Sequence, residues 1–222
     1  MATDDDISMQ APDPDELTLR RDVDLLYEIG TLRQVARAWV QFGNDRQLAN
    51  VAEHTLRVIW LSLVLAKHED ADAARVVQIA LVHDLAETRT GDVNYVSRMY
   101  VDRNETQAMR DSLNGTVLEG EALELWDEYK AQESLEAQIV KDADNLDCDL
   151  ELVESTARGH ELQETLAETR QSVRVQLRTE TGRRLFTRIY ESDPHTWHRD
   201  TRNRLTAGDW AEPTTRSSSV SG

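Results

Sequence analysis

The sequence contains little cysteine, few aromatic residues and no long apolar run. Its single cysteine, Cys148, cannot form an intrachain disulfide and is typical of a reducing compartment, where it needs no chemical role. Aromatic residues make up only 5% of the chain, and no apolar stretch is long enough to cross a bilayer. Residues 1–6 lack the basic start and apolar segment of a secretory signal. We therefore expect a cytoplasmic protein with no membrane contact.

Lysine is almost absent, and acidic residues outnumber basic ones. Only Lys67, Lys130 and Lys141 are lysines among the 25 basic residues, and the formal net charge is −17. Such an excess of negative charge is typical of halophilic proteins, because concentrated salt screens the self-repulsion. The alternative is an ordinary acidic protein from an arginine-biased genome. Under either explanation we expect no binding to duplex nucleic acid, since that requires a basic face.

Apolar residues spaced three and four apart predict an all-α fold. The chain has 222 residues, 39% of them hydrophobic, which suffices for one domain with a full core. We expect helices over residues 15–42, 50–67, 71–86, 105–130 (with a break near 114–115), 134–159, 162–179 and 182–191. The predicted domain spans residues 15–212, between a flexible acidic tail over 1–14 and a disordered Ser/Thr-rich tail over 213–222.

One stretch changes abruptly from apolar to ionisable residues. The apolar run over residues 76–82 is followed within ten positions by His83, Asp84, Glu87, Arg89 and Asp92. Burying a histidine beside an aspartate costs free energy unless both are paired. A divalent cation bound by imidazole nitrogen and carboxylate oxygen would pair with both. The alternative is a helix that ends at the surface, where both side chains meet water.

Helical periodicity places some of the other candidates. His54 lies on the apolar face of the predicted helix 50–67, so it is either a metal ligand or a buried structural histidine. Asp144 borders the apolar stripe of helix 134–159, whereas the other aspartates of that stretch are expected to point more toward solvent: Asp142, Asp147 and Asp149. If the preceding helix continues to Glu87, that residue shares a face with His83.

Three stretches together resemble the HD superfamily of metal-dependent phosphohydrolases. They are residues 50–58 with His54, residues 80–92 with His83 and Asp84, and residues 139–147 with Asp144. The words Val-Ala-Glu-His, His-Asp-Leu-Ala-Glu and Thr-Gly-Asp are similar to those of its 5′-deoxynucleotidase branch. The resemblance covers residues 32–154 and implies an HD-domain helical bundle.

The resemblance also implies a metal centre and a substrate site. The implied ligands of one divalent ion (Mn, Co, Fe, Zn or Mg) are His54, His83, Asp84 and Asp144. The implied catalytic groups are Glu87 and Asp92, and either could transfer the proton; on residues alone, they are a surface acid and a turn residue. The implied substrate-binding residues are Arg37, Arg46 and Trp39. Ala38 separates Arg37 from Trp39, whereas bacterial relatives place the tryptophan directly after the arginine.

The implied activity is metal-dependent hydrolysis of a nucleoside monophosphate. A 5′-nucleotidase of this kind releases phosphate from (deoxy)ribonucleoside 5′-monophosphates, and the resemblance leaves a homodimer open. One alternative is an HD phosphohydrolase of another phosphate ester. A second is a non-catalytic nucleotide-binding HD protein, which leaves Glu87 and Asp92 unexplained. A third is an acidic helical interaction module, which gives no reason for His54 together with His83.

Overall fold

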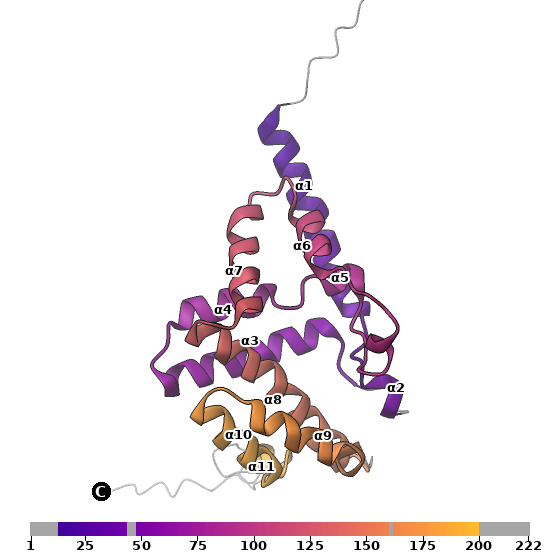
Figure 1. The fold of residues 1–222 in the computed structure, drawn as a ribbon, viewed down its shortest axis with the longest axis vertical. Coiled ribbons are helices and arrows are strands. Elements are labelled where there is room, and N and C mark those ends of the chain that lie inside the picture. Colours follow the sequence, from indigo (N-terminus) through magenta and orange to yellow (C-terminus); the bar gives the residue numbers. More distant parts are fainter. Residues whose placement is uncertain (1–12, 44–47, 160–161, 200–222) are drawn as a thin grey trace, which may run out of the picture.

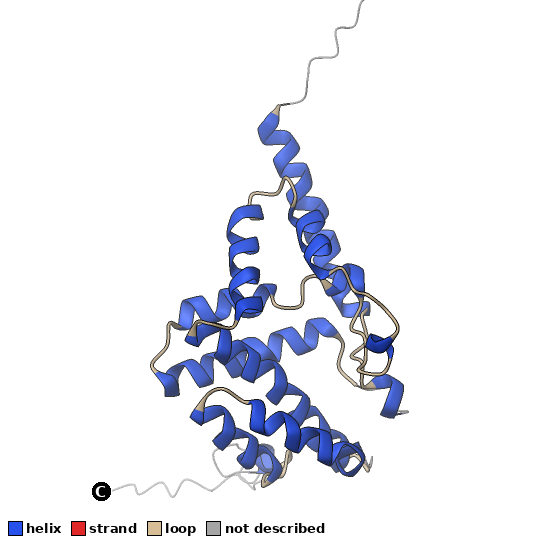
Figure 2. Ribbon diagram, in the orientation of Figure 1, coloured by secondary structure: helices blue, strands red, loops and turns tan. Residues whose placement is uncertain are grey.

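The computed structural model describes residues 13–43, 48–159 and 162–199, and these ranges contain helices but no β-strand (Figures 1 and 2). The helices are α1 (Pro14–Ile29), η1 (Gly30–Gln34), α2 (Val40–Gly43), α3 (Val51–Glu69), α4 (Ala73–Val82), α5 (Glu87–Thr90), η2 (Ser97–Met99), α6 (Glu105–Leu113), α7 (Glu119–Ala131), α8 (Leu135–Ala157), α9 (Leu162–Gln176), α10 (Glu180–Tyr190) and α11 (Thr196–Arg199). The predicted all-α fold is confirmed. The two predicted tails lie almost entirely outside the described residues.

Helix α8 is the centre of the bundle. It packs against α3, α4, α7, α9 and α10. In the view of Figure 1, α3, α4 and α8 occupy the middle, α1, α6 and α7 lie above them, and α9 and α10 lie below. Ile139, Val140, Ala143 and Leu146 of α8 are fully buried. Burial of each large apolar side chain contributes about 1.5–3 kcal/mol, so this face holds the surrounding helices together.

Two of the predicted long helices are interrupted in the structure. The first ends at Ile29, continues as the 3-10 helix η1 and then becomes extended, with an isolated bridge from Ala36 to Asn50. The third ends at Val82, and residues 83–86 form turns before α5 begins at Glu87. The apolar spacing continues through these points, which is why periodicity predicted unbroken helices. The predicted break between α6 and α7 is present, with Gly115 at φ +75°.

The prediction that Asp142, Asp147 and Asp149 point toward solvent is wrong. All three are at most 1% exposed. Because neighbouring helices cover several sides of α8, its polar positions are buried as well as its apolar stripe. Each aspartate therefore has partners, among them the backbone N–H of Thr179 for Asp142, His54 for Asp147 and Arg170 for Asp149. Periodicity indicates where apolar residues cluster, but it does not show how many faces are covered.

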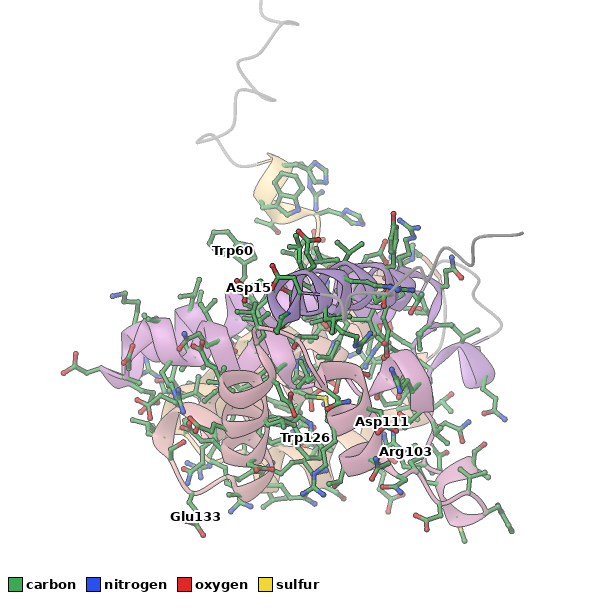
Figure 3. All side chains as sticks on the ribbon, turned by 90° about the horizontal axis from the view of Figure 1, so that it is seen from above. Asp15, Trp60, Arg103, Asp111, Trp126 and Glu133 are labelled. Atoms are coloured by element: carbon green, nitrogen blue, oxygen red, sulfur yellow. The ribbon has the colours of Figure 1, made fainter. Side chains whose placement is uncertain are left out.

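Some large apolar side chains remain at the surface. Trp60 projects from α3 and is 65% exposed (Figure 3), and Tyr27 of α1 is 77% exposed. In the parts of the chain that the structure describes, no helix combines the length and the hydropathy needed for a bilayer crossing.

Candidate metal centre

Three helices bring together the four predicted metal ligands. His54 lies in the first turn of α3, which begins with a capping box between Asn50 and Glu53. His83 and Asp84 lie in the turn after α4, and Asp144 lies on α8. Because α3 and α4 both pack on α8, side chains that are 30 and 90 residues apart meet at one point.

The donor atoms of these residues are spaced as ligands of one ion would be. The Nε2 atom of His54 lies 3.4 Å from that of His83, 3.4 Å from Oδ2 of Asp84 and 3.3 Å from Oδ1 of Asp144. The Nε2 atom of His83 lies 3.2 Å from Oδ2 of Asp84. Ligands bound at right angles about 2.1 Å from a metal ion are roughly 3 Å apart. The donor atoms of His54, His83 and Asp144 all lie within 4.8 Å of one another, so these three have the dimensions of a metal site, and Asp84 contacts both histidines.

Each imidazole ring is oriented by a hydrogen bond at its Nδ1 atom. Nδ1 of His54 lies 2.5 Å from Oδ2 of the buried Asp147, and Nδ1 of His83 lies 2.7 Å from the carbonyl oxygen of Ala80. When each Nδ1–H donates to its oxygen, each Nε2 carries a lone pair that points into the cluster. Two lone pairs and two carboxylates then converge without a donor between them. This arrangement fits a bound cation.

The pKa values also indicate that the cluster requires positive charge. Burial lowers the pKa of His54, but hydrogen bonds with carboxylates, that of Asp144 foremost, outweigh it and hold this pKa well above its usual value. Burial raises the pKa of Asp84 and Asp144, but the nearby histidines and Lys141 outweigh it and hold both well below their usual range. Carboxylates that remain ionised in a buried cluster need a cation, which can be a protonated imidazole or a metal ion.

Glu87 lies beside the cluster without joining it. It is the first residue of α5 and is 7% exposed, and its Oε2 atom has no hydrogen-bond partner in the described parts of the chain. Burial, followed by the charges of Asp84 and Asp92, raises the pKa of Glu87 to about 9. A buried carboxyl group with an unused oxygen, facing a polar cavity, is typical of a group that works on a ligand.

Arg37 and Asp92 form a second pair next to the cluster. The Arg37 guanidinium is 7% exposed, and its Nη1 atom lies 3.1 Å from Oδ2 of Asp92 and 3.7 Å from Oδ2 of Asp84. Asp92 also accepts a hydrogen bond from the backbone N–H of Ala38 at 2.9 Å. The Nε atom of Arg37 has no partner among the described residues. Arg37 is therefore a buried cation with a donor still available.

Two adjoining cavities open onto these residues. One, of about 230 Å³, contains the acids and cations around His83 and Asp84; the other, of about 190 Å³, is lined by Trp39 and Cys148. They share five lining residues: Arg37, Asp92, Arg98, Lys141 and Asp144. Of the predicted substrate residues, Arg37 and Trp39 thus lie at the site. Arg46 lies outside the described residues.

Periodicity and the family pattern missed several groups at the site. Asp147 orients His54. Nη1 of Arg103 lies 3.6 Å from Oε1 of Glu87, and the Tyr129 hydroxyl donates to Asp144 at 3.2 Å. Nζ of Lys141 lies 2.8 Å from Oδ2 of Asp144. The sequence carried a signal for Lys141 alone, which is one of three lysines and stands three positions before a predicted ligand.

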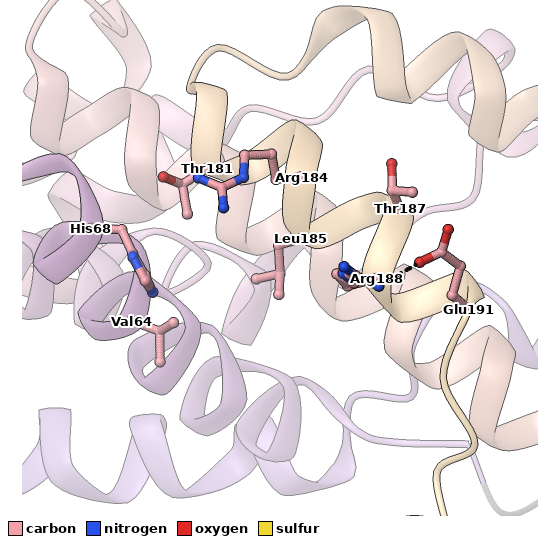
Figure 4. A pocket seen from close by; sticks show the side chains of 8 residues that line it. All are labelled: Val64, His68, Thr181, Arg184, Leu185, Thr187, Arg188 and Glu191. Atoms are coloured by element: carbon pink, nitrogen blue, oxygen red, sulfur yellow. Dashed lines mark hydrogen bonds and ion pairs between the residues drawn. The ribbon is translucent and has the colours of Figure 1, made fainter.

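A larger cavity, of about 480 Å³, lies elsewhere between α3 and α10 (Figure 4). Val64, His68, Leu185 and Arg188 are among its lining residues, and none of the predicted site residues is. One of its cations, Arg188, pairs with Glu191 at 2.9 Å. Most of the predicted site residues in the described ranges line the two smaller cavities instead.

Comparison with known proteins agrees with this architecture. A family model for the HD domain matches residues 29–182. The 5′-deoxynucleotidase HDDC2 of Bos taurus is 35% identical over 131 residues, which are 57% of this chain and 63% of the relative. The chain thus spans less than two thirds of the length of that relative.

Solved structures are similar over most of the chain. A conserved hypothetical protein from Pyrococcus furiosus is 27% identical, with a TM-score of 0.62 over 77% of this chain and 99% of that one. A predicted metal-dependent phosphohydrolase from Magnetospirillum magnetotacticum MS-1 has a TM-score of 0.65 over 82% of this chain and 93% of its own. It is 22% identical, so this likeness supports the fold alone. Since the HD domain model covers more than half of the sequence and the structure has the predicted helical fold, the chain belongs to the HD domain family.

Proposed function

We propose that His54, His83, Asp84 and Asp144 hold one divalent ion, with Mn, Co, Fe, Zn and Mg as the candidates. Imidazole nitrogen and carboxylate oxygen suit all of these, with Mg favoured least because it prefers oxygen ligands. The observation that carries the proposal is the convergence of two oriented Nε2 atoms and two carboxylates within 3.2–3.4 Å contacts. A catalytic rather than structural centre is favoured because the cluster lines an open cavity.

We propose that this centre makes the protein a metal-dependent 5′-nucleotidase. Its substrates would be (deoxy)ribonucleoside 5′-monophosphates, which yield inorganic phosphate and a nucleoside. The presence of Glu87 and Asp92 in the same cavity favours catalysis over nucleotide binding alone. The name of the bovine relative, a 5′-deoxynucleotidase, favours this substrate class over another phosphate ester.

The side chains of the cavity suit each part of such a reaction. A bound divalent ion would polarise a phosphoryl oxygen and lower the pKa of a water molecule. The Nε donor of Arg37, which has no partner among the described residues, suits a remaining phosphoryl oxygen, and Lys141 adds a second cation at the boundary of both cavities. Water adds to phosphorus, the bond from phosphorus to O5′ breaks, and O5′ takes up a proton.

Glu87 is the group that we assign to proton transfer. Burial keeps its pKa high, so it can carry a proton at neutral pH and give it to the leaving oxygen. A cation at Asp84 would act in the opposite direction and bring that pKa closer to neutrality. Asp92 is held by Arg37 and by the N–H of Ala38, which suits it to positioning the substrate.

A phosphate-release assay tests the proposed function. Protein stripped with a chelator and reloaded with Mn or Co should release phosphate from deoxyribonucleoside 5′-monophosphates, and the stripped protein should not. Release from other phosphate esters but not from nucleotides would favour the second candidate substrate class. Nucleotide binding without phosphate release under any metal would support a regulatory HD protein instead.

The same assay tests the role of Arg37. Arg37→Ala should lower kcat/KM for nucleotides by on the order of 10²-fold, because a charge-assisted hydrogen bond to phosphate and the buried positive charge beside it are lost. Metal content should be unchanged. Arg33→Ala, which removes an exposed arginine four positions earlier, is the matched control and should behave as the wild type. Wild-type kinetics in Arg37→Ala would show that another cation holds the phosphate.

The cytoplasmic location, the halophilic character and the homodimer stay predictions. Exposed apolar side chains on α1 and α3, such as Tyr27 and Trp60, are compatible with self-association. Light scattering on the purified chain decides between a monomer and a homodimer.

A further inference from the structure

The smaller cavity differs in character from the one beside the metal ligands. Trp39 and Tyr95 line it, together with Val93 and the thiol of Cys148. The cavity of about 230 Å³ is lined mainly by charged groups, and Tyr129 is the aromatic residue among its lining side chains. A charged cavity suits phosphate, whereas aromatic rings suit the flat face of a base.

The two aromatic residues come from segments that are tied together at two points. The backbone N–H of Ala38 donates to Asp92, and the Asn94 amide donates to Gln41. Trp39 lies between the two tied positions of its segment, and Tyr95 directly follows Asn94 on the other. The contacts hold the stretch after α5 against α2 and the residues before it, and both Trp39 and Tyr95 line the same cavity.

Asn94 fixes the local conformation of the stretch that carries Tyr95. Its Oδ1 atom accepts hydrogen bonds from the backbone N–H groups of Val96 and Ser97 at 3.0 and 2.9 Å, just before η2. Arg170 of α9 forms a second wall, and it is also fixed: it is 4% exposed and donates to Asp149 and to the carbonyl oxygen of Asn145. Trp39 packs against Leu152 and Leu166. Three of the walls are therefore built before a ligand arrives.

We propose that this second cavity takes the nucleobase and that Tyr95 is the residue on which the base stacks. The inference rests on the proposed function, which places phosphate in the first cavity. The five residues shared by both cavities, Arg37 and Asp92 among them, lie where the cavities join, so the sugar would span this junction between phosphate and base. Tyr95 lines this cavity and is 56% exposed, so a base that enters from solvent can reach it. Stacking on tyrosine accepts all four bases, so it supplies affinity rather than base choice.

The test pairs a substitution with a truncated substrate. Tyr95→Ala should raise KM for dAMP and for dCMP about tenfold and leave kcat within about twofold, since stacking acts at a distance from phosphorus. The same variant should leave KM for 2-deoxyribose 5-phosphate, which has no base, unchanged. Tyr95→Phe retains the ring and should resemble the wild type. Tyr100→Ala is the matched control, because Tyr100 lies on the same stretch, is 81% exposed and does not line the cavity.

Two results would overturn the proposal. One is an equal loss on dAMP and on 2-deoxyribose 5-phosphate, which would mean that Tyr95 acts on the phosphate or on the fold. The other is wild-type KM for dAMP in Tyr95→Ala. If the wild-type protein releases phosphate from no nucleotide, the proposed function fails and calorimetry with deoxyadenosine tests the base site alone. Saturable binding that Tyr95→Ala weakens about tenfold supports the site, and absent or unchanged binding refutes it.

Discussion

His54 and His83 are oriented by groups of different strength. His54 is backed by the carboxylate of Asp147, which is itself held by Arg57, whereas His83 is backed by the carbonyl oxygen of Ala80. A carboxylate behind a ligating imidazole raises its basicity, whereas a backbone carbonyl mainly fixes its orientation. Burial raises the pKa of Asp147, but the hydrogen bond from His54 outweighs it and keeps this acid ionised. The His54 ring therefore has the greater electron density of the two.

Substitution of a proposed metal ligand and of a proposed catalytic residue should have different effects on metal content and turnover. His83→Ala removes one of the four donor atoms, so both metal content and turnover should be lost. Glu87→Ala should keep most of the metal, because Glu87 lies outside the cluster of donors, and should lose on the order of 10²-fold or more in turnover. Metal content and turnover are measured on the same preparations. If Glu87→Ala loses its metal as completely as His83→Ala does, Glu87 is a ligand.

Sequence patterns supplied the candidate residues of the centre but not their partners. The order His54, His83, Asp84, Asp144 matches a family pattern, and the structure places the four together. Asp147 could not be distinguished from other aspartates of α8, because its importance depends on which helix faces it. Glu87 was expected to share a face with His83 on one helix, and it reaches the same cavity through a turn instead.

The turn between α4 and α5 shows why helix ends are hard to predict. Leu85 and Glu87 donate to the carbonyl oxygens three residues before them, at 3.2 and 3.0 Å, so the backbone tightens without a glycine or proline. The residues of this turn include His83 and Asp84. Within this turn, Nε2 of His83 lies 3.2 Å from Oδ2 of Asp84.

The junction between α8 and α10 is a second element that periodicity did not predict. Oδ1 of Asp142 accepts from the N–H of Arg178, and Oδ2 accepts from the N–H and the hydroxyl of Thr179, each at 2.8 Å. A Cβ atom at Gly182 would lie 2.5 Å from Oδ2 of Asp142. The carboxylate cannot move away without losing these bonds. Glycine at position 182 therefore permits α10 to approach α8.

Gly182→Ala should destabilise the fold through this contact. We expect a loss of about 1–3 kcal/mol, as for other overpacked sites, and a fall in Tm of several degrees. Gly120→Ala is the control, since no atom lies within 4 Å of its added Cβ and alanine favours the helix there. Thermal unfolding of both variants is the measurement. Equal Tm values for Gly182→Ala and the wild type would show that the Asp142 carboxylate can move away from the added Cβ atom.

The charge of the whole molecule is distributed unevenly. The net charge is −17, yet five basic side chains line the cavity beside the metal ligands: Arg37, Arg98, Arg103, Lys130 and Lys141. Two of the three lysines in the chain are among them. These cations offset the local acids, so the proposed anionic substrate would meet less repulsion here than the net charge implies. Neither the composition nor the net charge indicated this local balance, since it depends on which helices meet.

Stability should rise with salt concentration. Like charges spread over the surface repel one another, and the Debye length falls from about 10 Å at 0.1 M to about 3 Å at 1 M, which screens the repulsion. Thermal unfolding in a series of KCl concentrations should therefore show a substantial rise in Tm. A flat series would contradict the halophilic explanation and favour a genome rich in arginine codons.

The central claim is that one divalent ion at His54, His83, Asp84 and Asp144 is required for phosphate release. The most direct measurement is a titration of the stripped protein with Mn or Co, in which bound metal and phosphate release from a deoxyribonucleoside 5′-monophosphate are followed together. Activity should rise in proportion to bound metal and saturate at about one ion per chain, by the single-site geometry of the cluster. Acidification should weaken binding, because protons compete for the imidazoles. Full activity in the stripped protein, or no bound metal at any loading, would contradict the claim.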